Sequence, residues 1–213
     1  MTPLQVFLFF ILFSSSSSSK ADLLQDFCVA DLNFPQGLAG YPCKSLSNVT
    51  VDDFVFTGFR NPGNTSNINM LSITPAFVAQ WPAVNGLGIS VAYVEMAPGG
   101  RVPVHTHPGG TELIVVTEGT IIAGFISSSN KAYTKKLEAF EAMIFPQGLL
   151  HFQVNAGSVK AKLLVSFSSP NPGVQIISTA LFGNDLSSEI LEEVSSIDVA
   201  EVKKLKAMFG GTN

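Results

Sequence analysis

The sequence predicts an all-β domain, either a sandwich or a barrel, that is followed by short helices at the C-terminus. From about residue 87 to 179, short segments rich in Val, Ile, Phe and Thr are separated by Gly, Pro, Asn and Ser. Apolar residues at helical spacing come only after residue 187. The chain of 213 residues is long enough for one domain with a sizeable core.

The expected strands follow one another along the middle of the chain. They lie in the segments GISVAYVEM, TELIVVTEG, TIIAGFI, EAMIFP, HFQVNA, AKLLVSFSS and VQIISTALF. The polar segment SSSNKAY between the third and the fourth is typical of a hairpin tip. The barrel is therefore expected over about residues 54–180, within a single domain of residues 22–213.

Two short helices are expected at about residues 187–209. The segment SSEILEEVSSI places Ile190 and Val194 at helical spacing after Ser187, which is a good N-cap. The second helix follows in DVAEVKKLKAMF and ends at Gly210. Apolar faces of this size are rarely left exposed in a monomer, so either the barrel or another subunit is expected to cover them.

The first 21 residues are expected to be a cleaved signal peptide. The run LQVFLFFILF has the length of a signal-peptide h-region, and the small residues that end at Ala21 suggest the cleavage site. A membrane anchor is the alternative, but the run is shorter than the roughly 20 residues that span a bilayer. No later segment has the length and apolarity of a transmembrane helix. We therefore expect a secreted protein.

The cysteines and two glycosylation sequons agree with secretion. Cys28 and Cys43 are the only cysteines, and an even count in a secreted chain indicates a disulfide. A pair of buried free thiols is the alternative. Asn48 and Asn64 each begin an Asn-x-Ser/Thr sequon. The formal net charge of −4 gives the protein no electrostatic reason to bind nucleic acid.

All three histidines lie in two patterned segments. His105 and His107 are separated by one residue, so they project from the same side of an extended strand. A PGGT turn then allows Glu112 to lie beside them, and a Pro/Gly turn precedes His151. Four ligands of this kind suit a divalent transition metal. Three unrelated structural histidines are the alternative.

The choice of metal follows from the number and type of ligands. Four protein ligands leave two positions open on a six-coordinate ion, which Mn²⁺ and Fe²⁺ tolerate. Structural Zn²⁺ usually takes a closed tetrahedral site, commonly with thiolates. The ligand set therefore favours Mn²⁺ or Fe²⁺ over Zn²⁺.

The two segments resemble the two sequence motifs of the cupins. The first, G-x5-H-x-H-x4-E-x6-G, lies on Gly99, His105, His107, Glu112 and Gly119. The second, P-x-G-x2-H-x3-N, lies on Pro146, Gly148, His151 and Asn155. Stretches such as LLQDFCVADL and LLVSFSSPNPG resemble the germin-like proteins of plants over nearly the whole mature chain, and most of all their auxin-binding branch.

This resemblance implies a double-stranded β-helix, the jelly-roll barrel of the cupins, with short C-terminal α-helices. It also implies Mn²⁺ at the four ligands, secretion to the apoplast and cell wall, and a hexamer built as a trimer of dimers. The implied activity is that of a superoxide dismutase. The alternatives are a protein that binds auxin or another small carboxylate, and a non-enzymatic protein of the cell wall or a nutrient store.

The chain departs from the family pattern at two places. Phe140 stands where the second motif usually has a glycine. Germins with oxalate oxidase activity carry two asparagines that hold the acid; one corresponds to Asn85, and the other falls on Ala92, which offers no side-chain hydrogen bond. A site that lacks a polar partner binds a polar substrate poorly. Oxalate oxidation is therefore disfavoured, and Asn85 is the candidate substrate-binding residue.

Overall fold

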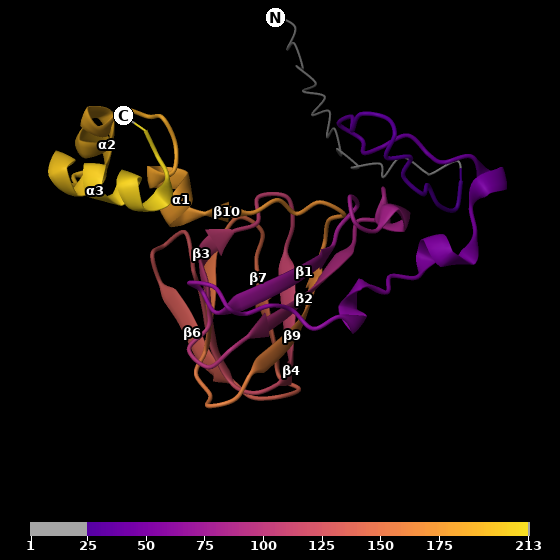
Figure 1. Ribbon diagram of the computed structural model, residues 1–213, viewed down its shortest axis with the longest axis horizontal. Coiled ribbons are helices and arrows are strands. Elements are labelled where there is room, and N and C mark those ends of the chain that lie inside the picture. The colour runs from indigo at the N-terminus through magenta and orange to yellow at the C-terminus, as the bar shows by residue number, and fades with distance from the viewer. Residues whose placement is uncertain (1–24, 213) are drawn as a thin grey trace, which may run out of the picture.

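Two five-stranded antiparallel sheets form the barrel of the protein (Figure 1). The computed structural model describes residues 25–212, so the expected signal peptide lies outside the described residues. The strand orders are β1-β2-β9-β4-β7 and β10-β3-β8-β5-β6. Most neighbours in each sheet are not consecutive in sequence, as a jelly roll requires, so the predicted fold class is confirmed.

The elements have the following bounds. The first sheet consists of β1 (Leu71–Ala76), β2 (Ser90–Met96), β9 (Ala161–Phe167), β4 (Glu112–Glu118) and β7 (Ala142–Phe145). The second consists of β10 (Gln175–Ile176), β3 (Arg101–Thr106), β8 (Leu150–Asn155), β5 (Ile121–Ile126) and β6 (Ala132–Leu137). The α-helices are α1 (Ile177–Phe182), α2 (Ser188–Ser195) and α3 (Val199–Phe209). The 3-10 helices are η1 (Leu46–Asn48), η2 (Val51–Phe54), η3 (Gly58–Arg60) and η4 (Pro82–Val84).

The core of the barrel lies between the two sheets, because successive side chains of a strand point to opposite faces. On β4 and β9, every second residue along most of the strand is buried. Ile114 of β4 lies opposite Val165 of β9, and both are buried in the core. Ile121 and Ala123 of β5, in the second sheet, belong to the same buried cluster, so the core joins the two sheets.

One expected hairpin tip is confirmed, and one expected strand is mostly a helix. The polar segment SSSNKAY forms the turn that joins β5 to β6, and β6 lies at the edge of its sheet and pairs with β5 alone. The apolar segment VQIISTALF, expected as a strand, pairs with β3 only over Gln175–Ile176 and then continues as α1. A short apolar run fits a strand or a buried helix equally well, so the sequence does not separate the two.

Three C-terminal helices form a helical unit (α1–α3) that projects beside the barrel (Figure 1). The predicted N-cap begins α2 and the predicted stop ends α3: the side chain of Ser187 accepts a hydrogen bond from the Ile190 N–H, and Gly210 adopts the left-handed conformation after α3. No helix within residues 25–212 has the length and apolarity needed to cross a membrane.

The helical unit has a small core of its own. Leu191 and Val202 are buried there against Phe182. The exposed fractions of Ile190 and Val194 are 47% and 72%, so part of the apolar face remains uncovered. The expected apolar faces are thus covered partly by one another and not by the barrel.

A disulfide joins Cys28 and Cys43 in the N-terminal arm, residues 25–70, and their Cα atoms lie 4.9 Å apart. Replacing both cysteines with serine is expected to lower the free energy of unfolding by about 3 kcal/mol, because the bond closes a loop of about 15 residues. Urea unfolding measures the change. Reducing the wild type should bring it to the level of the double variant, and an unchanged midpoint in both cases would contradict the expectation.

Phe140, at the position of the usual glycine, adopts the backbone conformation that glycine favours, with φ of 70°. Its side chain is 85% exposed. The left-handed conformation costs a residue with a Cβ about 1–2 kcal/mol, which exceeds the roughly 0.5–1 kcal/mol of chain entropy that glycine loses on folding. Phe140→Gly is therefore expected to stabilise the protein by up to about 1 kcal/mol. Phe140→Ala keeps the Cβ, so equal melting temperatures for the two variants would refute this cause.

Candidate metal centre

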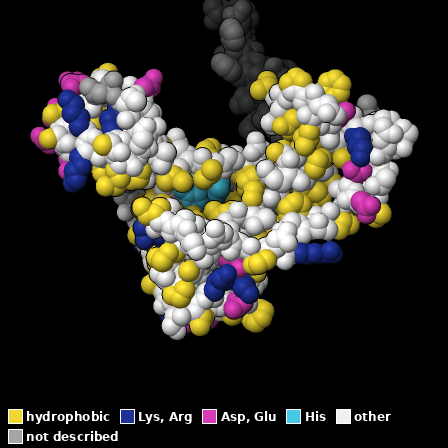
Figure 2. All heavy atoms as spheres, viewed as in Figure 1, with side chains coloured by type: hydrophobic (Ala, Val, Ile, Leu, Met, Phe, Trp, Pro, Cys, Tyr) yellow, Lys and Arg dark blue, Asp and Glu magenta, His cyan; other side chains and the backbone are white. Residues whose placement is uncertain are grey.

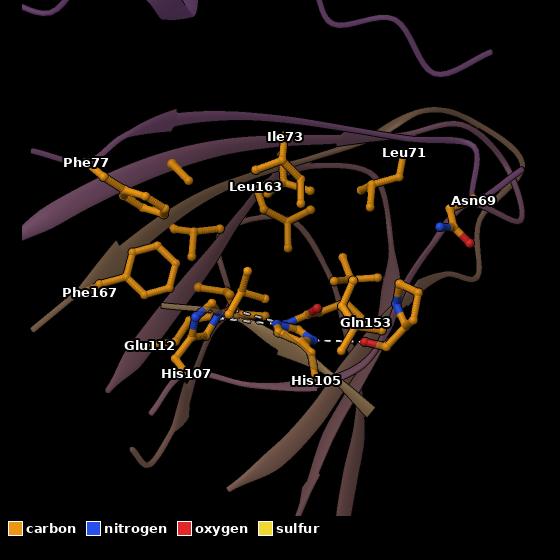
Figure 3. Close-up of a pocket in the computed structure, with 18 residues that line it drawn as sticks. Asn69, Leu71, Ile73, Phe77, His105, His107, Glu112, Gln153, Leu163 and Phe167 are labelled. Atoms are coloured by element: carbon orange, nitrogen blue, oxygen red, sulfur yellow. Dashed lines mark hydrogen bonds and ion pairs between the residues drawn. The ribbon is translucent and has the colours of Figure 1, made fainter. Parts of the chain in front are cut away.

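Three imidazoles and one carboxylate converge inside the barrel, and Figure 3 draws three of these side chains, His105, His107 and Glu112. His105 lies on β3, His107 follows that strand directly, Glu112 begins β4, and His151 lies on β8. The antiparallel register of β3 and β8 sets His105 opposite His151. All four side chains are buried, and their ligand atoms lie within 4.8 Å of one another. The structure thus brings together all four residues that the sequence singles out.

The two turns that precede the ligands are hydrogen-bonded to each other. The Gly148 N–H donates to the carbonyl of His107 at 3.1 Å. The side-chain amide of Gln147 donates to the carbonyl of Pro108 at 2.7 Å. These contacts couple the two motifs, so the ligands of the first motif are held in place relative to His151.

Each histidine is oriented by a hydrogen bond from its Nδ1 to a backbone carbonyl. The acceptors are the carbonyls of Pro103 for His105, at 2.9 Å, of Leu149 for His151, at 2.8 Å, and of Gly173 for His107. A carbonyl only accepts, so each Nδ1 carries the proton. In a neutral imidazole, Nε2 then presents its lone pair, which is the form that binds a metal.

The separations between these atoms fit a metal ion. Oε2 of Glu112 lies 2.9 Å from Nε2 of His107 and 3.2 Å from Nε2 of His151. Nε2 of His105 lies 4.0 Å from the same oxygen. Metal–ligand bonds of about 2.0–2.2 Å place neighbouring ligand atoms of an octahedron about 3 Å apart and opposite ones about 4.2 Å apart. Converging lone pairs in a buried site are stabilised by a cation, so the donor set suits a divalent metal.

The surroundings hold two of the ligands in the protonation state that a metal requires. Burial, and then the nearby His151, lower the pKa of His105 to about 4. Burial alone raises the pKa of Glu112, but its contacts with His107 and His151 outweigh this and lower the pKa to about 2. At neutral pH His105 is therefore neutral and Glu112 is anionic, and these two groups need to release no proton when a metal binds.

A cavity of about 220 Å³ extends from the site and is lined by three of the four ligands, His105, His107 and Glu112. Its walls are largely apolar and include Leu71, Ile73, Phe77, Val102, Leu163 and Phe167 (Figure 3). On the molecular surface, histidine atoms are visible at the bottom of a hollow bordered by hydrophobic side chains (Figure 2). A volume of this size would hold about seven waters at roughly 30 Å³ each. The cavity therefore has room for more than a diatomic molecule.

Gln153 is a site residue that the sequence analysis does not single out. It follows His151 by two residues on β8 and so points to the same face. Its side-chain amide donates to Oε1 of Glu112 at 3.1 Å, on the side of the carboxylate away from the histidines. The available signal is its spacing from His151, because a residue two positions after a ligand in a strand shares the face of that ligand.

Asn85 is not among the residues that line the cavity. Its Oδ1 accepts a hydrogen bond from the Tyr41 N–H at 3.1 Å, and its Nδ2 donates to the Tyr41 carbonyl at 2.9 Å. These bonds tie the N-terminal arm to the barrel, so we do not carry Asn85 forward as a substrate-binding residue. Ala92 does line the cavity and adds to its apolar wall.

Several known proteins are similar to this chain in sequence or in structure. A family model described as cupin matches residues 57–203. The auxin-binding protein ABP19a of Prunus persica is 54% identical over 207 residues, which cover 97% of each chain. A germin-like protein of Morus alba is 54% identical over 206 residues, again 97% of each chain. A solved structure of recombinant oxalate oxidase with glycolate is 38% identical, with a TM-score of 0.84, over 90% of this chain and 98% of that one.

Proposed function

Because this chain belongs to the germin-like proteins of the cupin family, we propose that it holds Mn²⁺ at its four buried ligands and binds a small carboxylate there. One observation carries the proposal: the cavity that ends at the ligands has largely apolar walls. A carboxylate can reach the metal while an apolar body fills the cavity. Pockets of this kind, apolar with a few placed polar groups, are typical of small-molecule sites.

Three imidazoles and one carboxylate leave positions open on a six-coordinate ion, which Mn²⁺ tolerates; Fe²⁺ or Zn²⁺ are the alternatives. When bound, the ion supplies a fixed positive charge for an anion. The chain's own residues do the rest. Glu112 offsets part of the positive charge, and the carbonyl partners of the histidines keep the Nε2 atoms directed at the centre.

The apolar walls favour a ligand with an apolar body. An aromatic or aliphatic group would pack against Leu71, Ile73 and Phe167 and displace water from the cavity. The Prunus persica relative is named an auxin-binding protein. Auxin, an aromatic carboxylate, is thus a candidate ligand. Oxalate is disfavoured, because it has no apolar part and the cavity wall offers Ala92 and Val102 to it.

Superoxide dismutase activity is the second candidate. It needs a metal that changes oxidation state and open positions for a small anion, and the four-ligand site is compatible with both. The cavity is larger than superoxide requires, so its volume favours the carboxylate. If neither function is present, the metal would serve mainly to stabilise the barrel, as in a wall or storage protein.

We also propose that the protein is secreted and forms an oligomer. Secretion is supported by the h-region, by the disulfide and by the exposure of both sequon residues, Asn48 and Asn64. An oligomer is supported by the uncovered apolar side chains of the helical unit, such as Val194. Light scattering of the purified protein tests for the expected hexamer, and a monomer at micromolar concentration would contradict it.

Calorimetric titration with indole-3-acetate tests the main proposal. The manganese-loaded protein is expected to bind it, whereas the chelated protein and Glu112→Gln are expected not to. A superoxide assay on the same samples tests the second candidate. Activity without binding would favour superoxide dismutation, and binding that survives chelation would refute the placement of the carboxylate at the metal.

A further inference from the structure

Asn69 gives the cavity a second polar point besides the metal ligands. Apart from those ligands and from Gln153, which bonds Glu112, it is the only polar side chain among the described residues that line the cavity. Figure 3 shows Asn69 at one end of the labelled side chains, well away from His107 and Glu112. A ligand whose carboxylate lies at the metal can therefore meet a polar side chain elsewhere along the wall.

The side-chain amide of Asn69 is available to a ligand. It is partly buried, and neither its Oδ1 nor its Nδ2 forms a hydrogen bond with any group in residues 25–212. The side chain of Asn67, two positions earlier, is used differently, because its Nδ2 donates to the carbonyl of Leu71 at 2.7 Å. Asn67 thus holds the loop together, whereas the structure gives the amide of Asn69 no such task.

The backbone of Asn69 is held on both sides. Its N–H donates to Oδ1 of Asn67 at 3.1 Å, and its carbonyl accepts a hydrogen bond from the Arg101 N–H at 2.9 Å. Two residues later Leu71 begins β1, and its side chain also lines the cavity. Neither backbone bond involves the Asn69 side chain. The amide is therefore presented from a fixed position, and a change of this side chain leaves both bonds in place.

We infer that Asn69 binds a polar group of the ligand that lies away from its carboxylate, so that the cavity selects aromatic carboxylates with a hydroxyl group or a ring N–H on the far side of the ring. This inference rests on the proposed carboxylate function. An amide both donates and accepts, so it can pair with either group. A polar group that met only apolar wall would lose its hydrogen bonds to water without replacement, and the ligand would bind more weakly.

Two pairs of probes of different length test the inference. One pair is 3-(4-hydroxyphenyl)propanoate and 3-phenylpropanoate, and the shorter pair is 4-hydroxyphenylacetate and phenylacetate; the members of each pair differ by one hydroxyl group. Calorimetric titration of the manganese-loaded wild type is expected to show about fivefold tighter binding of the hydroxylated member in at least one pair, as one net hydrogen bond gives.

Asn69→Leu keeps the size of the side chain and removes both polar atoms, so it is expected to lose the preference for the hydroxylated probe. Asn171→Leu is the matched control. It makes the same chemical change at an exposed asparagine that does not line the cavity, and it is expected to keep the fivefold ratio. A purely structural role of Asn69 would change the affinities of both members of a pair together and leave their ratio unchanged.

The outcomes separate this inference from the proposed function. Equal binding within both pairs by the wild type, or a fivefold ratio that persists in Asn69→Leu, would overturn the role of Asn69 and leave the carboxylate function standing. If no probe binds a wild type that holds its metal, both are overturned. The wild-type ratios need no variant, so a failure of Asn69→Leu to fold would still leave the inference open to refutation.

Discussion

The Glu112→Gln variant is expected to fold and to hold no stoichiometric metal. The change removes the only carboxylate of the four-residue site and supplies a side-chain amide in its place. The amide N–H groups can donate to the Nε2 lone pairs of His107 and His151, which lie 2.9 and 3.2 Å from the carboxylate oxygen. These lone pairs then have hydrogen-bond partners, and the site no longer needs a cation. Because changes at residues that only orient ligands cost about 10–100-fold in metal affinity, losing the ligand itself should cost at least about 100-fold.

Glu138→Gln provides the matched control for this experiment. Glu138 is an exposed glutamate that bonds Thr120 and Lys136, away from the metal ligands. It undergoes the same chemical change and is expected to keep full metal content. Competition with a coloured chelator measures both affinities. Equal affinity in Glu112→Gln and the wild type would show that Glu112 is not a ligand.

Removing the metal from the wild type is expected to lower the free energy of unfolding by about 4 kcal/mol when the free metal is about 1,000-fold above its dissociation constant. The ligands come from β3, β4 and β8 and the turn after β3, and an unfolded chain does not hold them together. The metal therefore binds the folded state and stabilises it.

Calorimetry with and without a chelator measures this stabilisation. The melting temperature of the wild type should fall on chelation, and that of Glu112→Gln should stay the same, because this variant has no metal to lose. A wild type whose melting temperature does not respond to chelation would mean that the four residues are a structural cluster and not a metal site.

The ligand set can be predicted from the sequence because it depends on local rules. Residues two apart share a face of a strand, which places His105 with His107. Pro and Gly turns then reverse the chain before Glu112 and His151. The predicted caps at Ser187 and Gly210 also depend on neighbouring residues alone, and the structure shows both.

Other features depend on contacts between distant segments and cannot be predicted in this way. Asn85 bonds Tyr41, which lies 44 residues away, and this contact decides that the amide holds the arm and does not line the cavity. Gln153 meets Glu112 only because β8 and β4 face each other across the barrel. The volume of the cavity depends on how many separate side chains pack together, so no single sequence motif predicts it.

The presence of a manganese ion at the four ligands is tested most directly by elemental analysis of the wild-type protein, expressed in plant cells and purified without chelators. About one manganese ion per chain is expected, with the metal released when the protein is denatured in acid and the ligands take up protons. A metal content far below one ion per chain, or the same content in Glu112→Gln, would contradict the assignment of His105, His107, Glu112 and His151 as a metal centre.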